Sequence, residues 1–262
     1  MGTTITVLSQ KGGTGKTTTV RTLTDVFRRL GLDTLCVDLD PQGNLSDYFD
    51  VPADASPTVA DVLAGQARAA DAVYDESILP ANLGLAEAEL ILAGKMGREM
   101  TLKRGLRDVK RRYDLVVIDC PPSLGLLTVN ALVAADHALI SSEAEYFSLQ
   151  GVEQALEVIE LAKDSLHPDL DWLGVVMNIA DMRLVHSREA QAQLKERFGE
   201  KVFDTVVRRS VRYAESAERG VSILDYAPDL GADYVALAEE ILGRLGGEYD
   251  EARGQLAALT PA

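Results

Sequence analysis

Short apolar stretches alternate along the chain with stretches in which apolar residues recur at helical spacing. The apolar stretches occupy residues 5–8, 34–39, 115–118, 138–141, 173–177 and 202–207. Val20, Leu23, Phe27 and Leu30 lie on one face of a predicted helix that ends at Gly31. Continuous apolar strands separated by helices predict an α/β fold, with a mainly parallel twisted sheet and helices on both faces. Such a sheet binds ligands at the carboxyl ends of its strands.

The pattern weakens between residues 50 and 98, where Pro52, Pro57 and Pro80 interrupt it. We expect short helices there, with a possible extra strand near residues 83–85, and treat the segment as an insertion in the same domain. A single domain is therefore predicted for residues 1–247. Residues 248–262 are acidic and contain few large apolar side chains, so we expect a short, poorly ordered tail.

Composition limits the class of protein. The chain has 262 residues and a formal net charge of −15. Cys36 and Cys120 lie far apart in apolar stretches and form no CxxC pair, which indicates reduced, structural thiols. No apolar run reaches the length of about 18 residues that a membrane span requires, and the first predicted strand begins too early to leave room for a signal peptide. We expect a cytoplasmic protein without a membrane partner.

The sequence QKGGTGKTT, residues 10–18, lies between the first predicted strand and the first predicted helix. Glycines let the backbone turn tightly there and direct N–H groups at phosphate oxygens. Lys16 is expected to reach the β- and γ-phosphates, and Thr17 to hold Mg²⁺. A glycine-rich turn with exposed lysines is the alternative, and the order of strand, loop and helix argues against it. The predicted nucleotide-binding residues of the loop are Lys11, Gly12, Gly13, Thr14, Gly15, Lys16, Thr17 and Thr18.

The loop departs from the ordinary phosphate loop at its start. Gln10 stands where that pattern has glycine, and Lys11 is a second lysine. Lys11 cannot easily serve the same phosphates from the same side as Lys16. We therefore expect it to reach across a dimer interface and to act like an arginine finger supplied in trans.

Two aspartates follow predicted strands. Asp40, in DLDPQGN (residues 38–44), is the candidate for positioning the attacking water and contacting the Mg²⁺ shell. A turn or helix-cap aspartate is the alternative interpretation. Asp119, in YDLVVIDCPPS (residues 113–123), follows four apolar residues as a Walker B carboxylate does, and it is expected to accept from Mg²⁺-bound water or from Thr17.

Four motifs together resemble the ParA/Soj-type partition ATPases, a deviant Walker A group of P-loop NTPases that also includes MinD. They are KGGTGKTT, DLDPQGN, IDCPPSLGLLTVNAL and EYFSLQG. The resemblance implies that Lys11 acts across an ATP-sandwich homodimer, that Lys16 and Thr17 serve phosphate and Mg²⁺, that Asp40 is needed for hydrolysis, and that Asp119 is the Walker B residue. It further implies an ATPase that binds double-stranded DNA without sequence preference in its ATP state, is nucleoid-associated, and is stimulated by a ParB-like partner in chromosome or plasmid partition.

The net charge opposes DNA binding overall, but basic residues are clustered locally. Residues 98–112 hold seven Lys or Arg against two acids, a net charge of +5, and residues 183–219 hold nine against six, a net charge of +3. Arg183 and Arg212 fall where the resembled family carries its DNA-contacting arginines, and Arg209 belongs to the same cluster. A solvated helix face is the alternative for each cluster.

The chain also departs from the family pattern. In VRRSVR, residues 207–212, Arg208 replaces a proline expected beside the base and Ser210 replaces an asparagine. Arg208 and Asn178, which matches a base-contacting asparagine of the MinD branch, are therefore the candidate adenine contacts. Near the end of the domain, PDLG (residues 228–231) stands where the family often has a basic RSRG run.

Other functions share these motifs. A positioning ATPase for a protein cargo that tracks the nucleoid would carry all of them. A MinD-like membrane ATPase needs a basic amphipathic C-terminal helix, and the acidic tail does not supply one. A reductase like the nitrogenase iron protein needs cluster cysteines at its dimer axis, which two scattered cysteines do not provide.

Overall fold

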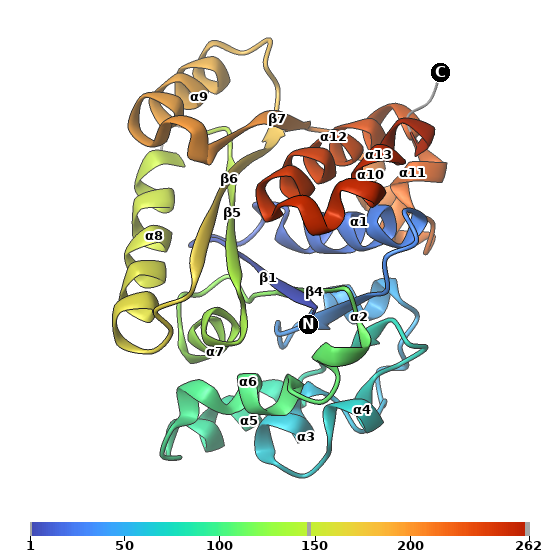
Figure 1. Cartoon of the computed structure of the whole chain (residues 1–262), viewed down its shortest axis with the longest axis vertical. Coiled ribbons are helices and arrows are strands. Elements are labelled where there is room, and N and C mark those ends of the chain that lie inside the picture. Colours follow the sequence, from blue (N-terminus) through green and yellow to red (C-terminus); the bar gives the residue numbers. More distant parts are fainter. Residues whose placement is uncertain (1, 146–147, 260–262) are drawn as a thin grey trace.

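A single seven-stranded sheet organises the chain, as the computed structural model shows (Figure 1). The structure describes residues 2–145 and 148–259. The strand order is β3-β2-β4-β1-β5-β6-β7, and each neighbouring pair is parallel, which confirms the predicted α/β class. The strands are β1 (Thr3–Leu8), β2 (Thr34–Asp38), β3 (Ile78–Leu79), β4 (Leu115–Asp119), β5 (His137–Glu143), β6 (Asp171–Ala180) and β7 (Val202–Arg208).

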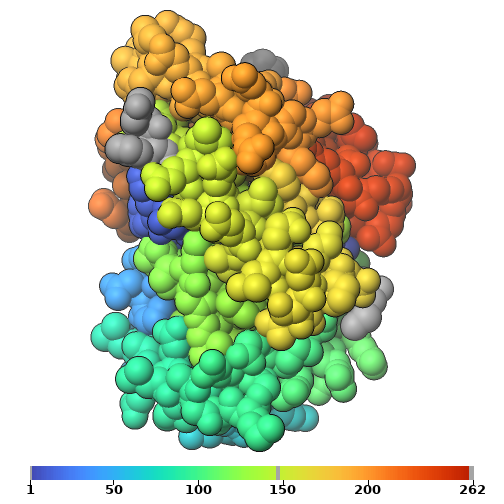
Figure 2. Space-filling view, turned by 90° about the vertical axis from the view of Figure 1, so that its left-hand side faces the viewer, coloured from blue at the N-terminus to red at the C-terminus, as the bar shows by residue number. Residues whose placement is uncertain are grey.

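Helices cover both faces of the sheet because successive side chains of a strand point in opposite directions. In β4, Val116 and Ile118 face one hydrophobic core, whereas Leu115 and Val117 face the other. The first core is covered by α3 (Val59–Ala64), α4 (Ala69–Ala72), α5 (Gly84–Ala93), α6 (Thr101–Leu106), α7 (Leu126–Ala134), α8 (Ser148–Ser165) and α9 (Val185–Phe198). Figure 2 shows α8 in the middle of this side of the molecule, with α9 above it and the segment of α5 and α6 below.

The opposite face carries α1 (Lys16–Arg29) and α12 (Pro228–Leu245), packed against each other. Val20, Leu23 and Phe27 of α1 are fully buried, and Gly31 follows with a φ of 78°, the left-handed conformation that ends many helices. The predicted first helix is thereby confirmed. The shorter helices on this side of the molecule are α2 (Asn44–Tyr48), α10 (Arg212–Glu218), α11 (Ile223–Tyr226) and α13 (Asp250–Gly254).

The extra strand expected near residues 83–85 is wrong, since the strand in this region is β3, which pairs with β2. Gly84 instead begins α5, and the apolar side chains that follow, Leu85, Ala88 and Leu92, are buried on one helix face. A helical spacing of three and four residues therefore explains these positions, whereas a strand would have alternated.

The end of the chain differs from the poorly ordered tail that we expected. Tyr249, Ala252 and Leu256 are buried in the core beneath α12. The Tyr249 hydroxyl donates to Thr3 Oγ1 at 2.8 Å, which ties this segment to β1. Residues 248–259 are thus packed against the sheet, and residues 260–262 lie outside the described part. A single domain over residues 1–247 stays a prediction.

Candidate active site

The carboxyl ends of three neighbouring strands bring the predicted site residues to one edge of the sheet. β1 lies next to β4, with Val7 opposite Asp119, and β4 lies next to β2, with Asp119 opposite Asp38. The loop after β1, Asp40 after β2 and Asp119 at the end of β4 are therefore neighbours. Tyr146 and Phe147 of the EYFSLQG motif lie outside the described residues.

The loop after β1 forms a backbone cradle at the start of α1. Gly13 and Gly15 adopt φ angles of 79° and 82°, which glycine reaches without strain. Gly15 precedes the first residue of α1 and has no side chain with which to cap the first N–H groups of the helix. Ser9 Oγ ties the loop together, since it donates to the Lys11 carbonyl at 2.7 Å and accepts from Thr14 Oγ1 at 2.9 Å. Unoccupied N–H groups at a helix start favour an anion.

Lys16 points into this loop. Its Nζ donates to Ser9 Oγ at 3.0 Å and to the Lys11 carbonyl at 3.1 Å. Burial lowers the pKa of Lys16, while the nearby Asp119 carboxylate raises it. The ammonium is thus held by neutral oxygens, which a phosphate group, with its greater negative charge, can replace.

Thr17 and Asp119 fit a magnesium ion. Thr17 Oγ1 donates to Asp119 Oδ2 at 2.7 Å, and Asp119 Oδ1 is buried without a hydrogen-bond partner within the described residues. Burial, followed by the charge of Asp38, raises the pKa of Asp119 well above its ordinary value. A cation or its bound water would satisfy the unpartnered oxygen and favour the charged carboxylate.

The described ranges contain no group of three or more His, Cys, Asp or Glu side chains arranged to hold a metal. Mg²⁺ commonly keeps several waters and binds through one or two protein ligands together with phosphate oxygens. The pair of Thr17 and Asp119 suits that mode of binding and does not suit a site built from protein ligands alone.

Asp40 lies beside this pair in a loop that Asp38 holds. Asp38 accepts from the Asp40 N–H at 3.0 Å, and from the Ser46 N–H at 3.0 Å and hydroxyl at 2.8 Å, while burial raises its pKa to about 6. Asp40 Oδ1 accepts from the Gln42 N–H at 3.0 Å, the geometry of a turn aspartate, and the Asp40 charge raises the pKa values of Lys16 and Asp119. Asp40 is therefore both a turn aspartate and a neighbour of Lys16 and Asp119. The sequence interpretation missed Asp38, although an acid ending an apolar strand was the available signal.

Lys11 is exposed at the same edge of the sheet. Its backbone carbonyl joins the Lys16 cradle. Its charge acts on Glu143 at the end of β5, whose pKa is raised by burial and by Glu145 and lowered by Lys11.

A cavity of about 310 Å³ adjoins the phosphate loop, and both candidate adenine contacts line it. Asn178 Nδ2 donates to Thr19 Oγ1 at 3.1 Å and to Ser141 Oγ at 2.6 Å, and its buried Oδ1 has no hydrogen-bond partner in the described part of the chain. Thr19 and Ser141, which the sequence interpretation did not single out, thus fix this amide. Its free oxygen is an acceptor of the kind that an amino group of a base requires.

The predicted DNA-binding arginines lie at two adjacent strand ends. Ala180 at the end of β6 pairs with Arg208 at the end of β7, and the Arg209 N–H donates to the Ala180 carbonyl at 3.0 Å. The turn that carries Arg183 therefore lies beside the turn that carries Arg209 and Arg212. The basic segment 98–112 is separate, because α6 covers the opposite face of the sheet.

Comparisons with known proteins agree with this geometry. Residues 2–172 match the family described as AAA domain. The sporulation initiation inhibitor protein Soj of Bacillus subtilis is 39% identical over 92% of this chain and 98% of its own length. A solved structure named as cobyrinic acid a,c-diamide synthase of Mycobacterium smegmatis, with bound ADP and magnesium, is 36% identical, covers 83% of this chain and 93% of its own, and has a TM-score of 0.76. McdA of Cyanothece in complex with ATP has a TM-score of 0.85 at 26% identity, over 92% of this chain and 96% of its own.

Proposed function

Because this chain belongs to the Soj/ParA family of chromosome-partitioning ATPases, we propose that ATP closes it into a homodimer that binds double-stranded DNA without sequence preference. The chain is an ATPase of the ParA/MinD type, and its cofactors are ATP and Mg²⁺. The dimer, the DNA and the roles of individual residues are our proposals.

Hydrolysis requires positioning and charge compensation more than covalent chemistry. In our proposal the N–H groups of residues 12–17 and the Lys16 ammonium hold the phosphates. Thr17 and Asp119 hold Mg²⁺, which when bound offsets the charge that develops on the phosphate oxygens. Asp40 orients the attacking water, since its loop is fixed by Asp38 at the same edge of the sheet. Asn178, with Arg208 as a second contact, recognises the base.

Lys11 supplies the argument for a dimer. Lys16 already donates into the loop from within the same chain, and the Lys11 carbonyl accepts one of its hydrogen bonds. Lys11 itself is exposed at the sheet edge. An exposed cation beside a phosphate site is placed to reach the phosphates of a second copy. We therefore propose that each Lys11 completes the active site of the partner.

One observation supports the DNA proposal most strongly. Residues 208–211 line the cavity beside the phosphate loop, and Arg209 and the adjoining Arg212 belong to this segment. Binding of a base in that cavity would contact the segment that presents the arginines, which gives nucleotide and DNA a physical connection. Two copies side by side double the number of phosphate contacts, and affinity rises steeply with that number through counterion release.

Partition also requires a partner and a location, which we carry over from the family. We propose that a ParB-like protein stimulates hydrolysis, and that the ATP-bound protein associates with the nucleoid in the cytoplasm without a membrane partner. No helix in the described ranges is both long and apolar enough to cross a membrane.

DNA-binding titrations without nucleotide, with ADP and with ATP, each at low and moderate salt, test the proposal. We expect ATP alone to produce tight binding and dimerisation, with an affinity that falls as salt rises.

Lys16→Ala should lose nucleotide binding and the ATP effect, whereas Asp40→Ala should bind ATP, stop turnover and accumulate as a dimer. Arg212→Glu should keep the dimer and lose DNA retardation. A protein that stays monomeric with a nonhydrolysable analogue and Mg²⁺ would refute the mechanism.

A further inference from the structure

Two acids at the start of α12 hold two arginines of the loop that carries the DNA-binding candidates. We propose that Asp229 competes with DNA phosphates for Arg212, that Asp233 holds the same loop in place through Arg208, and that these two contacts restrain DNA binding. The inference rests on the proposed function and adds a regulatory contact to it. It concerns the PDLG segment, which stands where a basic run was expected.

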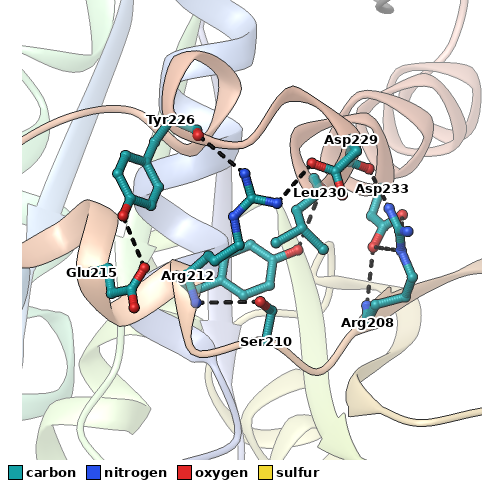
Figure 3. Close-up of polar contacts among 9 residues, drawn as sticks. Arg208, Ser210, Arg212, Glu215, Tyr226, Asp229, Leu230 and Asp233 are labelled. Atoms are coloured by element: carbon teal, nitrogen blue, oxygen red, sulfur yellow. Dashed lines mark hydrogen bonds and ion pairs between the residues drawn. The ribbon is translucent and has the colours of Figure 1, made fainter.

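Arg212 is bound by the end of α11 and by the start of α12 (Figure 3). Its Nη1 donates to Asp229 Oδ1 at 3.1 Å, and its Nη2 donates to the Tyr226 carbonyl at 3.3 Å. Tyr226 is held in turn, since its hydroxyl donates to Glu215 Oε2 at 2.8 Å. The guanidinium is therefore directed toward α11 and α12.

Arg208 is held more extensively by the next helical turn (Figure 3). Its Nε donates to Asp233 Oδ1 at 3.1 Å and to Oδ2 at 2.9 Å, and its backbone N–H donates to Asp233 Oδ2 at 3.0 Å. Its Nη2 donates to the Asp229 carbonyl. The Asp233 side chain is only 14% exposed, so Arg208 closes over an acid that is largely withdrawn from solvent.

The geometry makes the Asp229 carboxylate a competitor of phosphate for Arg212. A guanidinium offers a rigid fork of donors that suits a carboxylate and a phosphate equally well, so a donor engaged with one is withheld from the other. Each pair also cancels its own charge, which removes the local attraction for a polyanion.

The acids cannot follow the arginines outward to DNA, because both belong to a regular helix that begins with Pro228. Asp229 lies in the first turn of that helix, where the N-terminal end of the helix dipole stabilises a negative charge. Asp229 therefore retains a favourable environment after Arg212 departs. An arginine can leave while its acid remains in place, as a reversible restraint requires.

The position of the loop connects this restraint to the nucleotide site. Arg208, Ser210 and Val211 line the cavity of about 310 Å³, so a nucleotide in that cavity contacts the same loop that forms both ion pairs. We therefore expect the restraint to be strongest without nucleotide.

The test compares Asp229→Asn, Asp233→Asn and the double variant with the wild type. Asparagine keeps one acceptor oxygen and removes the charge. Binding to a fluorescent random-sequence duplex is measured by anisotropy without nucleotide and with ATP. Since the arginine of each pair is itself exposed and ion pairs of exposed side chains are weak, each single change should tighten binding by about two- to fivefold and the double change by about tenfold. The gain should be larger without nucleotide.

Glu218→Gln provides the matched control, because it removes one negative charge from an exposed position of α10, the helix that Arg212 begins. It should change the affinity less than either aspartate variant. In an Arg212→Ala background, Asp229→Asn should give no gain, since an effect that acts through Arg212 disappears with it. Should Asp233→Asn fail to fold, Asp229→Asn and this background decide the matter.

Four outcomes would overturn the inference. Equal gains from Glu218→Gln, or a gain from Asp229→Asn that survives in Arg212→Ala, would assign the effect to overall charge. If the wild type binds DNA in an ATP-dependent way and every aspartate variant binds with unchanged affinity, the restraint is refuted and the proposed function stands. Absence of DNA binding in all forms would remove both.

Discussion

Asp181 and Arg183 form a third acid–arginine pair within the predicted DNA surface. Both residues follow β6, and Arg183 Nε and Nη2 donate to the two carboxylate oxygens at 2.8 and 2.7 Å. Arg183 thereby lowers the pKa of Asp181 from its ordinary 3.8 to about 2. The arginine is 90% exposed and remains the most accessible of the arginine partners.

The pair predicts a measurable titration. In Arg183→Ala, the pKa of Asp181 should rise part of the way toward 3.8, because the guanidinium donors are gone while the backbone N–H of residue 183 still donates to the carboxylate. The pKa is lowered in the folded protein, so the stabilising contribution of the pair is present above pH 3.8 and is lost as pH falls toward 2. Carboxyl-carbon NMR of both proteins measures the shift. An Asp181 pKa in the variant equal to that of the wild type would show that the guanidinium is not its cause.

At the residue scale, the sequence indicated which side chains come together at the site. It was a poorer guide to the residues that hold those side chains in place. The spacing within residues 10–18 places Lys16 and Thr17 on one loop, and an acid after an apolar strand points to Asp119. Ser9 and Asp38 support residues of their own loops, two to eight positions away. Ser141 instead depends on which strands lie next to each other, because it lies in β5 and contacts Asn178 in the adjacent β6. No local pattern encodes that neighbourhood.

At the scale of elements, one buried arginine joins three helices. Arg21 of α1 donates to the Tyr213 carbonyl at 2.9 Å and to Ser216 Oγ at 2.8 Å, both in α10. Its guanidinium lies 4.6 Å from the centre of the Tyr48 ring in α2. The helix that follows the phosphate loop is thereby attached to the helix that Arg212 begins.

We predict that Arg21→Met destabilises the protein by about 2 to 3 kcal/mol, since it leaves a carbonyl and a hydroxyl in α10 without their charged donor. Urea unfolding measures the loss. Arg29→Met on the same helix is the control, because its ion pair with Asp225 is exposed and should contribute at most about 1 kcal/mol. Similar losses in the two variants would contradict a joining role for Arg21.

Element prediction was best where the periodic signal was long. The 14 residues of α1 present enough turns to define a buried face. The two residues of β3 do not reveal any period, and Pro80 obscures their boundary with α5. The site contacts that depend on this region, such as the Ala81 N–H donating to Ser46 Oγ at 2.9 Å, were therefore beyond sequence interpretation.

At the scale of the whole molecule, apolar patterning predicted the fold class but left the strand order undetermined. The central place of β1, between β4 and β5, brings strands far apart in sequence to the phosphate loop. The net charge of −15 was an equally incomplete guide to DNA binding, because it is a sum over the whole chain. The arginines of the 183–212 region respond instead to the acids that lie next to them.

The packed end of the chain gives the third prediction. Leu256→Ala should lower the free energy of unfolding by about 2 to 4 kcal/mol, because it removes a side chain buried in the second core. Leu90→Ala on α5 is the control, since Leu90 is 78% exposed and the change should stay within about 0.5 kcal/mol. Urea denaturation measures both. Small and equal losses of stability in the two variants would instead support the poorly ordered tail that the sequence predicted.

The contact between Tyr249 and Thr3 has a consequence for the order of events during synthesis. The strand that leads into the phosphate loop leaves the ribosome well before its flanking strands and this hydroxyl. Early folding intermediates therefore expose an apolar strand that still lacks its neighbours. Exposed apolar strands of this kind are the reason that nascent chains depend on chaperones. Competence to bind nucleotide is accordingly a property acquired late in translation.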